Sequence, residues 1–223
     1  SDIGFDEDGA VNEANQAGEN LFWAPLTADF LAGTAEGVSY AIAPMEGKLL
    51  TPLFASSQTV AIGGIEAAPE GGNLTLGSAY TYERIFTVGD GDIGSAVDNI
   101  LEAQGVETAT ISGHVLDAGA ASPISHAKVF VYKPGEDGPW SQWTTDVDLD
   151  DTNNDGSFGG TLPLGDWELM AYKHGHPASA RIPIEVTGAD IELTLELGAP
   201  AFVDFEIRDE TGQLIPSKIT IVR

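Results

Sequence analysis

The stretch 110–197 constrains the fold more than any other part of the chain, because short apolar runs alternate there with turn residues. The clearest run is 191–197, where apolar residues at odd positions alternate with Glu192, Thr194 and Glu196. A period of two places the apolar side chains on one face of a β-strand. We predict seven strands in this stretch, at 110–116, 128–132, 143–147, 156–162, 166–172, 181–186 and 191–197. Seven short strands separated by turns are typical of an immunoglobulin-like sandwich.

The first half of the chain contains further short apolar runs, which predict a second β-sandwich. Because proline lacks the amide hydrogen that a sheet requires, we expect strands to end, or to lie at a sheet edge, at Pro44 and Pro52. Pro183 likewise predicts an edge strand. A helix is predicted over 93–104, with Asp92 as its N-cap and Gly105 as the residue that ends it. We expect this helix to cover the sheet of the first half.

The predicted fold class is therefore all-β: a β-sandwich domain followed by an immunoglobulin-like sandwich, with one short helix near 93–104. The predicted domains are 1–108, which includes an acidic extended arm at 1–20, then 109–198, then a hairpin at 199–223. Two strands are marginally stable by themselves. We therefore expect either that the hairpin docks on the preceding domain or that it opens a further module beyond Arg223, and we favour the second alternative.

Acidic residues greatly outnumber basic ones, with 35 Asp and Glu against 9 Lys and Arg and a formal net charge of −26. Binding to nucleic acids and to anionic lipids depends on Lys and Arg contacts, so neither partner is expected. No apolar run approaches the roughly 20 residues of a membrane span, so no membrane insertion is predicted. The absence of cysteine excludes disulfides and thiol chemistry. Such an acidic surface is typical of an exported or salt-adapted protein.

Two segments, ISGHVLDAGAASPISHAKVFVY and DGSFGGTLPLGDWELMAY, carry a family resemblance. With them, 110–197 resembles the carboxypeptidase regulatory-like (transthyretin-like) domains of secreted bacterial proteins. The departures are Trp167, where the family has Tyr, and a long acidic insertion before Asp155. The resemblance implies a fold and says little about chemistry. The matching residues are Gly113, Pro123, Ala127, Val129, Asp155, Gly156, Phe158, Leu162, Pro163, Gly165 and Leu169.

A wider resemblance covers most of the chain. The order YERIFTVGDGDIGSAVDNI, then the sandwich, then DETGQLIPSKITI is similar to the region ahead of the catalytic domain in bacterial PHP-type (CehA/McbA-like) metallohydrolases. It implies a non-catalytic accessory region that positions or stabilises a following metal-dependent hydrolase domain. The expected partner is a C-terminal catalytic or repeat domain of the same protein, in an extracellular or periplasmic location. The alternative is a cell-surface adhesion or carbohydrate-binding module.

The acidic loop 146–156 contains the one candidate metal site. Asp151, Asn153, Asp155 and the following glycine match the first half of a D-x-[DN]-x-[DN]-G calcium loop, whose hard oxygen ligands suit Ca²⁺. The glutamate expected at the twelfth position is replaced by Leu162. The alternative interpretation is a solvated hairpin turn with a left-handed corner at Asp155-Gly156. No other cofactor is predicted.

Histidine and tryptophan provide the remaining candidates. His174 and His176 have the H-x-H spacing of a metal pair, but the glycine between them places both in a loop, so we favour structural or exposed histidines. His114 and His126 lie in or just before two strands that could be neighbours, and a packing role is preferred. Trp140 and Trp143 could be exposed and bind a glycan, whereas Trp167 alternates into the core. No catalytic residue is assigned to this chain, and whether its parent protein is an enzyme stays open.

The two interpretations of the acidic loop predict different effects of metal removal. If the loop binds Ca²⁺ through Asp151, Asn153 and Asp155, chelation with EDTA should lower the thermal melting midpoint, because a ligand of the folded state stabilises it. If the loop is a solvated turn, the midpoint should be the same with and without EDTA. A melting scan in both conditions distinguishes them, with Mg²⁺ added back as the control for Ca²⁺.

Overall fold

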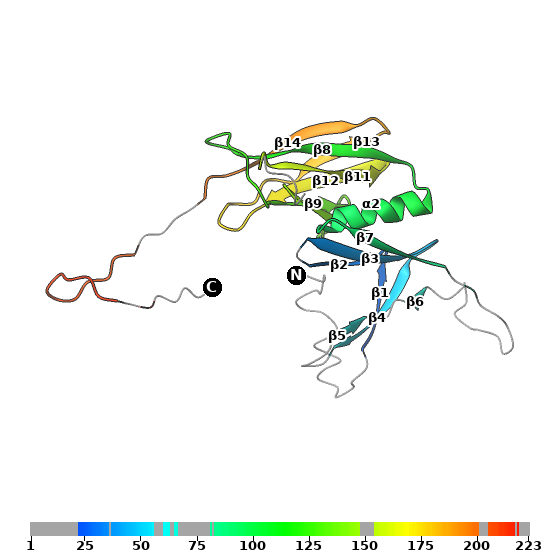
Figure 1. Ribbon diagram of the computed structural model, residues 1–223, viewed down its shortest axis with the longest axis horizontal. Coiled ribbons are helices and arrows are strands. Elements are labelled where there is room, and N and C mark those ends of the chain that lie inside the picture. Colours follow the sequence, from blue (N-terminus) through cyan, green and yellow to red (C-terminus); the bar gives the residue numbers. More distant parts are fainter. Residues whose placement is uncertain are drawn as a thin grey trace.

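The computed structural model describes residues 22–35, 37–55, 60–62, 65–66, 81, 83–147, 154–200, 205–216 and 218. Within these ranges the protein is built from β-sheets and a single helix, which confirms the predicted fold class. Figure 1 shows the helix, α2, between the sheets of the second half and those of the first half. No helix in the described ranges is both long enough and apolar enough to span a bilayer.

The second half of the chain forms a sandwich of two sheets. One sheet has the strand order β10-β9-β12-β13 and the other has the order β11-β8-β14. All seven predicted strands are present, with bounds shifted by a few residues, and β13 is an edge strand as Pro183 predicted. Their bounds are Thr108–Asp117 (β8), Lys128–Tyr132 (β9), Ser141–Thr144 (β10), Ser157–Pro163 (β11), Gly165–Tyr172 (β12), Ile182–Val186 (β13) and Ile191–Leu197 (β14).

The core of the sandwich lies between these two sheets. Buried residues alternate with less buried ones along β8 and β12, as the period-two pattern predicted, and the last strand, β14, runs parallel to β8. Burial of this apolar surface is the main favourable contribution to folding. The largest fully buried side chains of this core are Ile111, Val115, Val129, Val131, Trp143, Leu162, Leu169, Val186, Leu195 and Leu197.

The first half contributes two further sheets, with orders β1-β4-β5 (β6 also pairs with β4) and β2-β3-β7. Pro44 ends β3, as predicted. The prediction that a strand ends or lies at a sheet edge at Pro52 is wrong. Pro52 lies within β4, and β4 is paired on both sides. β4 pairs with β6 before Pro52 and with β5 after it, so the missing amide falls between two ladders. The bounds are Phe22–Ala28 (β1), Leu31–Ala35 (β2), Val38–Pro44 (β3), Leu49–Ala55 (β4), Val60–Ile62 (β5), Ile65–Glu66 (β6) and Arg84–Gly89 (β7).

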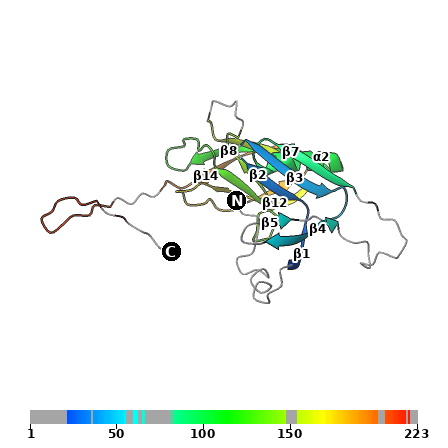
Figure 2. The same cartoon turned by 60° about the horizontal axis from the view of Figure 1, so that its bottom comes forward.

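Helix α2 (Ile93–Gln104) has both predicted caps. The Asp92 side chain accepts a hydrogen bond from the Ser95 amide at 2.8 Å, and Gly105 ends the helix in a left-handed conformation with φ of 65°. Ala96 and Ile100 pack against Ala41, Ala43 and Ile85. The helix therefore covers the β2-β3-β7 sheet as expected, and Figure 2 shows the helix beside β3 and β7 from a second direction.

The same helix also packs against the sandwich, which was not predicted. Trp143 of β10, for which exposure was one alternative, is only 1% exposed and lies between α2 and β11. A β-carbon added to Gly94 of α2 would lie 2.0 Å from Cδ1 of its ring, and one added to Gly160 of β11 would lie 2.0 Å from its Nε1. Glycine is therefore required on both sides of this indole.

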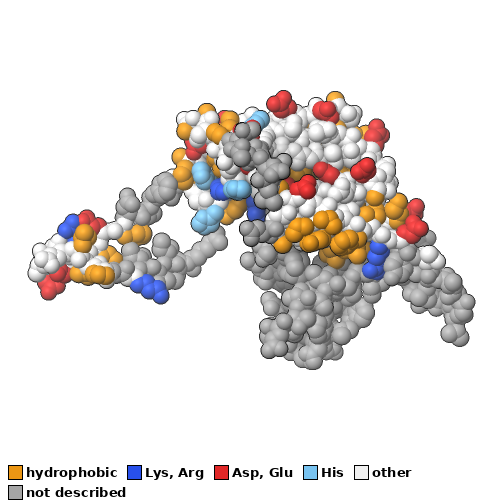
Figure 3. Space-filling model, in the orientation of Figure 1, with side chains coloured by type: hydrophobic (Ala, Val, Ile, Leu, Met, Phe, Trp, Pro, Cys, Tyr) orange, Lys and Arg blue, Asp and Glu red, His pale blue; other side chains and the backbone are white. Residues whose placement is uncertain are grey.

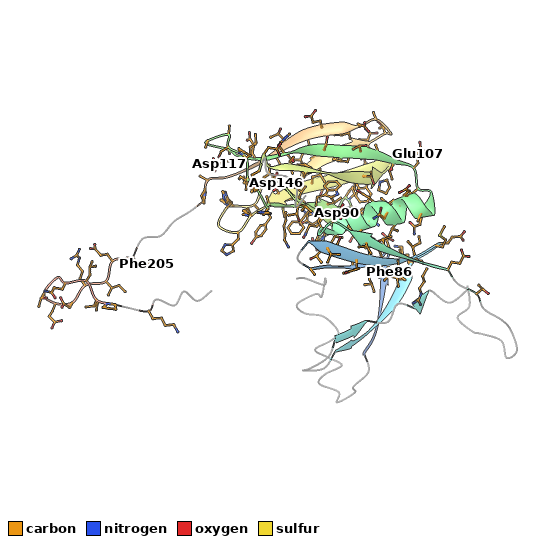
Figure 4. All side chains as sticks on the ribbon, viewed as in Figure 1. Phe86, Asp90, Glu107, Asp117, Asp146 and Phe205 are labelled. Atoms are coloured by element: carbon orange, nitrogen blue, oxygen red, sulfur yellow. The ribbon has the colours of Figure 1, made fainter. Side chains whose placement is uncertain are left out.

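The described part of the predicted C-terminal hairpin contains the turn but not the two strands. One isolated antiparallel bridge joins Arg208 to Leu214, and the Asp209 side chain accepts hydrogen bonds from the Thr211 and Gln213 amides within the turn. Figure 4 shows Phe205, at the start of this segment, far from the labelled residues of the sheets. Among the described residues no neighbouring sheet supports the hairpin, which accounts for its minimal pairing.

The glycine requirement at Trp143 gives a test of the packing between α2 and the sandwich. Gly160→Ala should lower the free energy of unfolding by about 2 kcal/mol, because the added methyl group overpacks the core against the indole. Gly159→Ala is the matched control in the same strand, since its nearest contact would be an ordinary 3.6 Å. Equal stabilities of the two variants in urea unfolding would contradict the packing.

Candidate functional site

Three carboxylates of the first half accept hydrogen bonds from the second half, and they define a junction between the two. They are Asp29, which follows β1, Asp92, the N-cap of α2, and Asp98, within α2. We call these residues and their partners the α2 junction. Figure 4 shows Asp90, two residues before the cap, where α2 begins beside the sandwich.

Asp92 combines two roles. One carboxylate oxygen caps α2, and the other accepts a hydrogen bond from the backbone amide of Thr144 at 3.0 Å. Thr144 is the last residue of β10, an edge strand of its sheet. An edge strand leaves backbone groups unpaired, and an unpaired buried amide is costly. The carboxylate therefore satisfies a helix end and a sheet edge together.

Asp98 has the same role at the second sheet. Its Oδ1 atom accepts hydrogen bonds from the backbone amide of Thr161 at 2.9 Å and from the Thr161 hydroxyl at 2.8 Å. Thr161 belongs to β11, which is one of the two edge strands of the β11-β8-β14 sheet. The edges β10 and β11 lie against each other and against α2. The helix thus closes this side of the sandwich.

The electrostatics of the two helix carboxylates follow from their burial. Burial raises the pKa of Asp92 above its ordinary value, although hydrogen bonds from Ser95 and Thr144 lower it, and the charge of Asp90 adds to the rise. Burial also raises the pKa of Asp98 and outweighs the hydrogen bonds from Thr161, and the charge of Asp92 adds to the rise. At neutral pH the charged forms are therefore held at an energetic cost in the junction.

Asp29 differs because cations surround it. Its carboxylate lies 2.6 Å from Lys133 Nζ and 3.7 Å from Lys48 Nζ, and it accepts a hydrogen bond from Trp140 Nε1 at 2.9 Å. Burial raises the pKa of Asp29, but the hydrogen bonds from Lys133 and Trp140 and the two lysine charges outweigh burial, so the pKa lies below its ordinary value.

Trp140 packs within the junction, which changes the interpretation of the tryptophans. Phe30 meets its ring edge-on with centroids 5.4 Å apart, and Trp167 lies 4.8 Å away on another side. Trp140 is partly buried and Trp143 is buried, so neither forms the exposed platform that the sequence suggested for a glycan. Trp167 is buried in the core, as predicted.

Of the candidate calcium ligands, Asp151 and Asn153 lie outside the described residues, and the calcium prediction stays a prediction. Asp155 is exposed, and its carboxylate accepts a hydrogen bond from the Ser157 amide at 3.0 Å. The Ser157 side chain and amide hold the pKa of Asp155 below its ordinary value. Among the described residues, no three His, Asp or Glu side chains are grouped to hold a metal ion.

The loop that carries these ligands is not a hairpin turn. It leaves β10 in one sheet and enters β11 in the other, so it crosses between sheets. Asp146 is buried at the start of this loop, and its carboxylate accepts a hydrogen bond from the Gly156 amide at 3.1 Å. Gly156 has φ of 73°, so the predicted left-handed corner is present. Figure 4 labels Asp146 at the junction end of this loop.

The histidines do not form a common site in the described structure. His174 is exposed in a turn, and His176 Nδ1 lies 2.8 Å from the carbonyl oxygen of Gly198, which fits the preferred interpretation of loop histidines. His114 lies in β8 and His126 precedes β9, and these strands belong to different sheets. The suggestion that neighbouring strands bring the last two together is therefore wrong.

A depression of about 380 Å³ lies on the outer side of β12 and β13. Asp166 and Glu185 in its lining are directly opposite each other in the strand register, and Glu168 lies on the same face. Like charges at opposed positions destabilise a sheet pair. Arg181, 3.4 Å from Glu168, neutralises part of this charge.

Comparisons with known proteins add little. No protein-family model and no curated protein matches the chain. Solved structures similar to it include a DUF3823 family protein from Parabacteroides merdae (16% identity, 44% of this chain and 49% of that chain, TM-score 0.31). They also include the Bacillus anthracis TIE protein, at 12% identity over 78% of this chain and 26% of that chain, with a TM-score of 0.30. A third is 5-hydroxyisourate hydrolase of Klebsiella pneumoniae, at 20% identity over 42% of this chain and 89% of that chain, with a TM-score of 0.28. The chain thus spans about half of the first and a quarter of the second, and no functional property is transferred at these TM-scores.

The raised pKa of Asp98 predicts a defined pH dependence. The folded state binds this proton more tightly than the unfolded state, whose ordinary value is 3.8. The contribution of Asp98 to stability is therefore full below that value and falls as pH rises through the folded pKa. Asp98→Asn keeps an acceptor for the Thr161 amide and stays neutral, so its stability relative to wild type should increase between about pH 4 and about pH 7.

Urea unfolding at several pH values measures this difference. Asp90→Asn, at an exposed carboxylate just before the N-terminus of α2, controls for the loss of one negative charge. A difference between Asp98→Asn and wild type that stays constant with pH would contradict the burial of this carboxylate.

Proposed function

We propose that this chain is a non-catalytic accessory region of a larger exported bacterial protein. In this proposal it positions or stabilises a metal-dependent hydrolase domain that follows it. The α2 junction is the observation that carries the proposal. An accessory region that positions a neighbouring domain needs a fixed geometry between its own parts. The junction joins the two halves through partly buried hydrogen bonds and not through a linker alone.

The hydrogen bonds of the carboxylates with shifted pKa values support a structural role for these residues. Asp92 and Asp98 have raised pKa values, which often mark catalytic acids and bases. Here both accept hydrogen bonds from backbone amides of edge strands, and this role accounts for their burial. Asp29 is held in an ion pair with Lys133. These three carboxylates therefore stabilise the contact between the two halves of the chain.

The sequence resemblances give the proposal its partner. Two sequence segments of 110–197 resemble those of a carboxypeptidase regulatory-like domain, and the wider chain resembles the region that precedes the catalytic domain of PHP-type metallohydrolases. Under this proposal, the metal ligands of the hydrolase lie beyond Arg223. The described segment 205–216, with exposed Phe205 and Leu214, would begin the connection to that domain.

The parent protein provides the test. We expect the coding sequence after Arg223 to encode a domain rich in His and Asp, with metal-dependent hydrolase activity. In that full-length protein, Asp92→Ala combined with Asp98→Ala should shorten the half-life of hydrolase activity on heating, whereas Asp90→Ala should leave it unchanged. Turnover by the 223-residue chain alone would contradict a non-catalytic role. A downstream series of β repeats with a surface anchor would instead favour adhesion.

A further inference from the structure

The outer face of β9 and β12, opposite the sandwich core, carries exposed aromatic and basic side chains. Phe130 and Met170 are opposite each other in the register, and so are Lys128 and Tyr172. Residues that alternate with them, such as Val129 and Ala171, are buried in the core. We call the surface formed by Lys128, Phe130, Met170 and Tyr172 the β9–β12 face.

The aromatic residues of this face are exposed at the Tyr172 end and buried at the Tyr132 end. The Tyr172 side chain is 40% exposed, and its ring centroid lies 6.3 Å from that of Phe130. Tyr132, the next residue of the row on β9, is buried beneath the guanidinium of Arg181, 3.7 Å from its ring centroid. The accessible aromatic surface is therefore centred on Tyr172.

Two basic residues adjoin Tyr172, although the chain has only 9 Lys and Arg and a net charge of −26. Lys128 is opposite it in the strand register, and Lys173 follows it in the chain. Lys173 Nζ donates hydrogen bonds to the carbonyl oxygens of Ser125 at 2.9 Å and His126 at 3.2 Å, which places its charge at the end of the face. Lys128 and Lys173 form no ion pair within the described part of the chain. Figure 3 shows histidines beside basic side chains at the left end of the sandwich.

The acidic groups nearest along the face do not cancel this charge. Glu168, opposite Tyr132 in the register, is paired with Arg181 at 3.4 Å. The adjacent strand β10 contributes neutral polar side chains instead, with Gln142 opposite Phe130 and Thr144 opposite Lys128. The neighbourhood of Tyr172 therefore combines uncompensated positive charge, an exposed ring and neutral hydrogen-bonding groups.

We propose that the β9–β12 face binds an acidic saccharide, with a sugar ring stacked on Tyr172 and its carboxylate beside Lys128. The apolar face of a sugar ring matches an aromatic ring, the hydroxyl groups match Gln142 and Thr144, and the carboxylate matches the lysine. Charge complementarity selects an anionic sugar over a neutral one, because Lys128 has no carboxylate partner among the described residues.

Sheet topology favours a saccharide over an acidic peptide. β9 is paired on both sides, with β10 and β12, and β12 is paired with β9 and β13. Their backbone groups are already used, so an extended peptide cannot be added as a further strand at this face. Recognition must use side chains alone, which suits a sugar. This site is independent of whether a hydrolase domain follows the chain.

Calorimetric titration with two uronate probes tests the proposal, namely a galacturonate hexamer and a glucuronate-containing oligosaccharide of similar length. At least one should bind the intact chain, and increasing salt should weaken the binding. Tyr172→Ala should weaken it about tenfold, the size expected for one stacked ring. Lys128→Gln should weaken it by about the same factor, because the sugar carboxylate then loses its cationic partner. Tyr172→Phe, which keeps the ring, should retain most of the affinity.

Two matched controls locate the site. Tyr40→Ala removes a ring that is 45% exposed on the β2-β3-β7 sheet, and Lys218→Gln removes an exposed lysine of the C-terminal segment. Neither should change the affinity. The proposal is overturned if neither uronate binds, if Tyr172→Ala and Lys128→Gln bind as wild type does, or if a neutral hexamer binds equally well. Equal binding of a polyglutamate peptide that depends on Tyr172 would assign the face to acidic peptides instead.

Discussion

The hydrogen bonds from the Thr144 and Thr161 amides to Asp92 and Asp98 join the two halves of the described chain. A two-sheet sandwich has open edges where strands end without partners, and such edges promote association with other chains. Here one edge strand of each sheet, β10 and β11, lies beside the other, and a single helix covers both. The position of Trp143 between glycines of α2 and β11 depends on the same contact. The helix therefore belongs structurally to both halves.

Some residues of the strongly acidic composition have a structural role, because their carboxylates accept hydrogen bonds from backbone amides. Carboxylates are acceptors only, and they bind backbone amides well, so acidic residues are suited to satisfying a helix N-terminus and a strand edge. The cost is burial of charge, which appears as the raised pKa values of Asp92 and Asp98. At Asp29 the same cost is offset by Lys133 and Lys48, and its pKa is lowered. Two of the 9 Lys and Arg residues thus stabilise the charged form of a partly buried carboxylate.

Much of the fold followed from the sequence, because period-two alternation and caps are local signals. The strands from β8 to β14 and both ends of α2 were predicted in this way. The second partner of α2 was not predicted. Asp98 lies outside the apolar stripe of the helix, where sequence alone favours a solvent-facing residue, and only the tertiary contact shows that it accepts a hydrogen bond from the Thr161 amide. The small residue Gly94, one turn earlier, was the available signal for a close neighbour. Pro52 was misplaced because strand pairing depends on register, which local sequence does not encode.

Amide hydrogen exchange of Thr144 and Thr161 in the native protein tests most directly whether α2 closes the sandwich edge. If it does, both amides should be protected to a degree similar to the paired amides of β8, because exchange then requires the junction to open. Protection at Thr161 should disappear selectively when alanine replaces Asp98. Rapid exchange of both amides in the wild-type protein, with β8 still protected, would contradict the account.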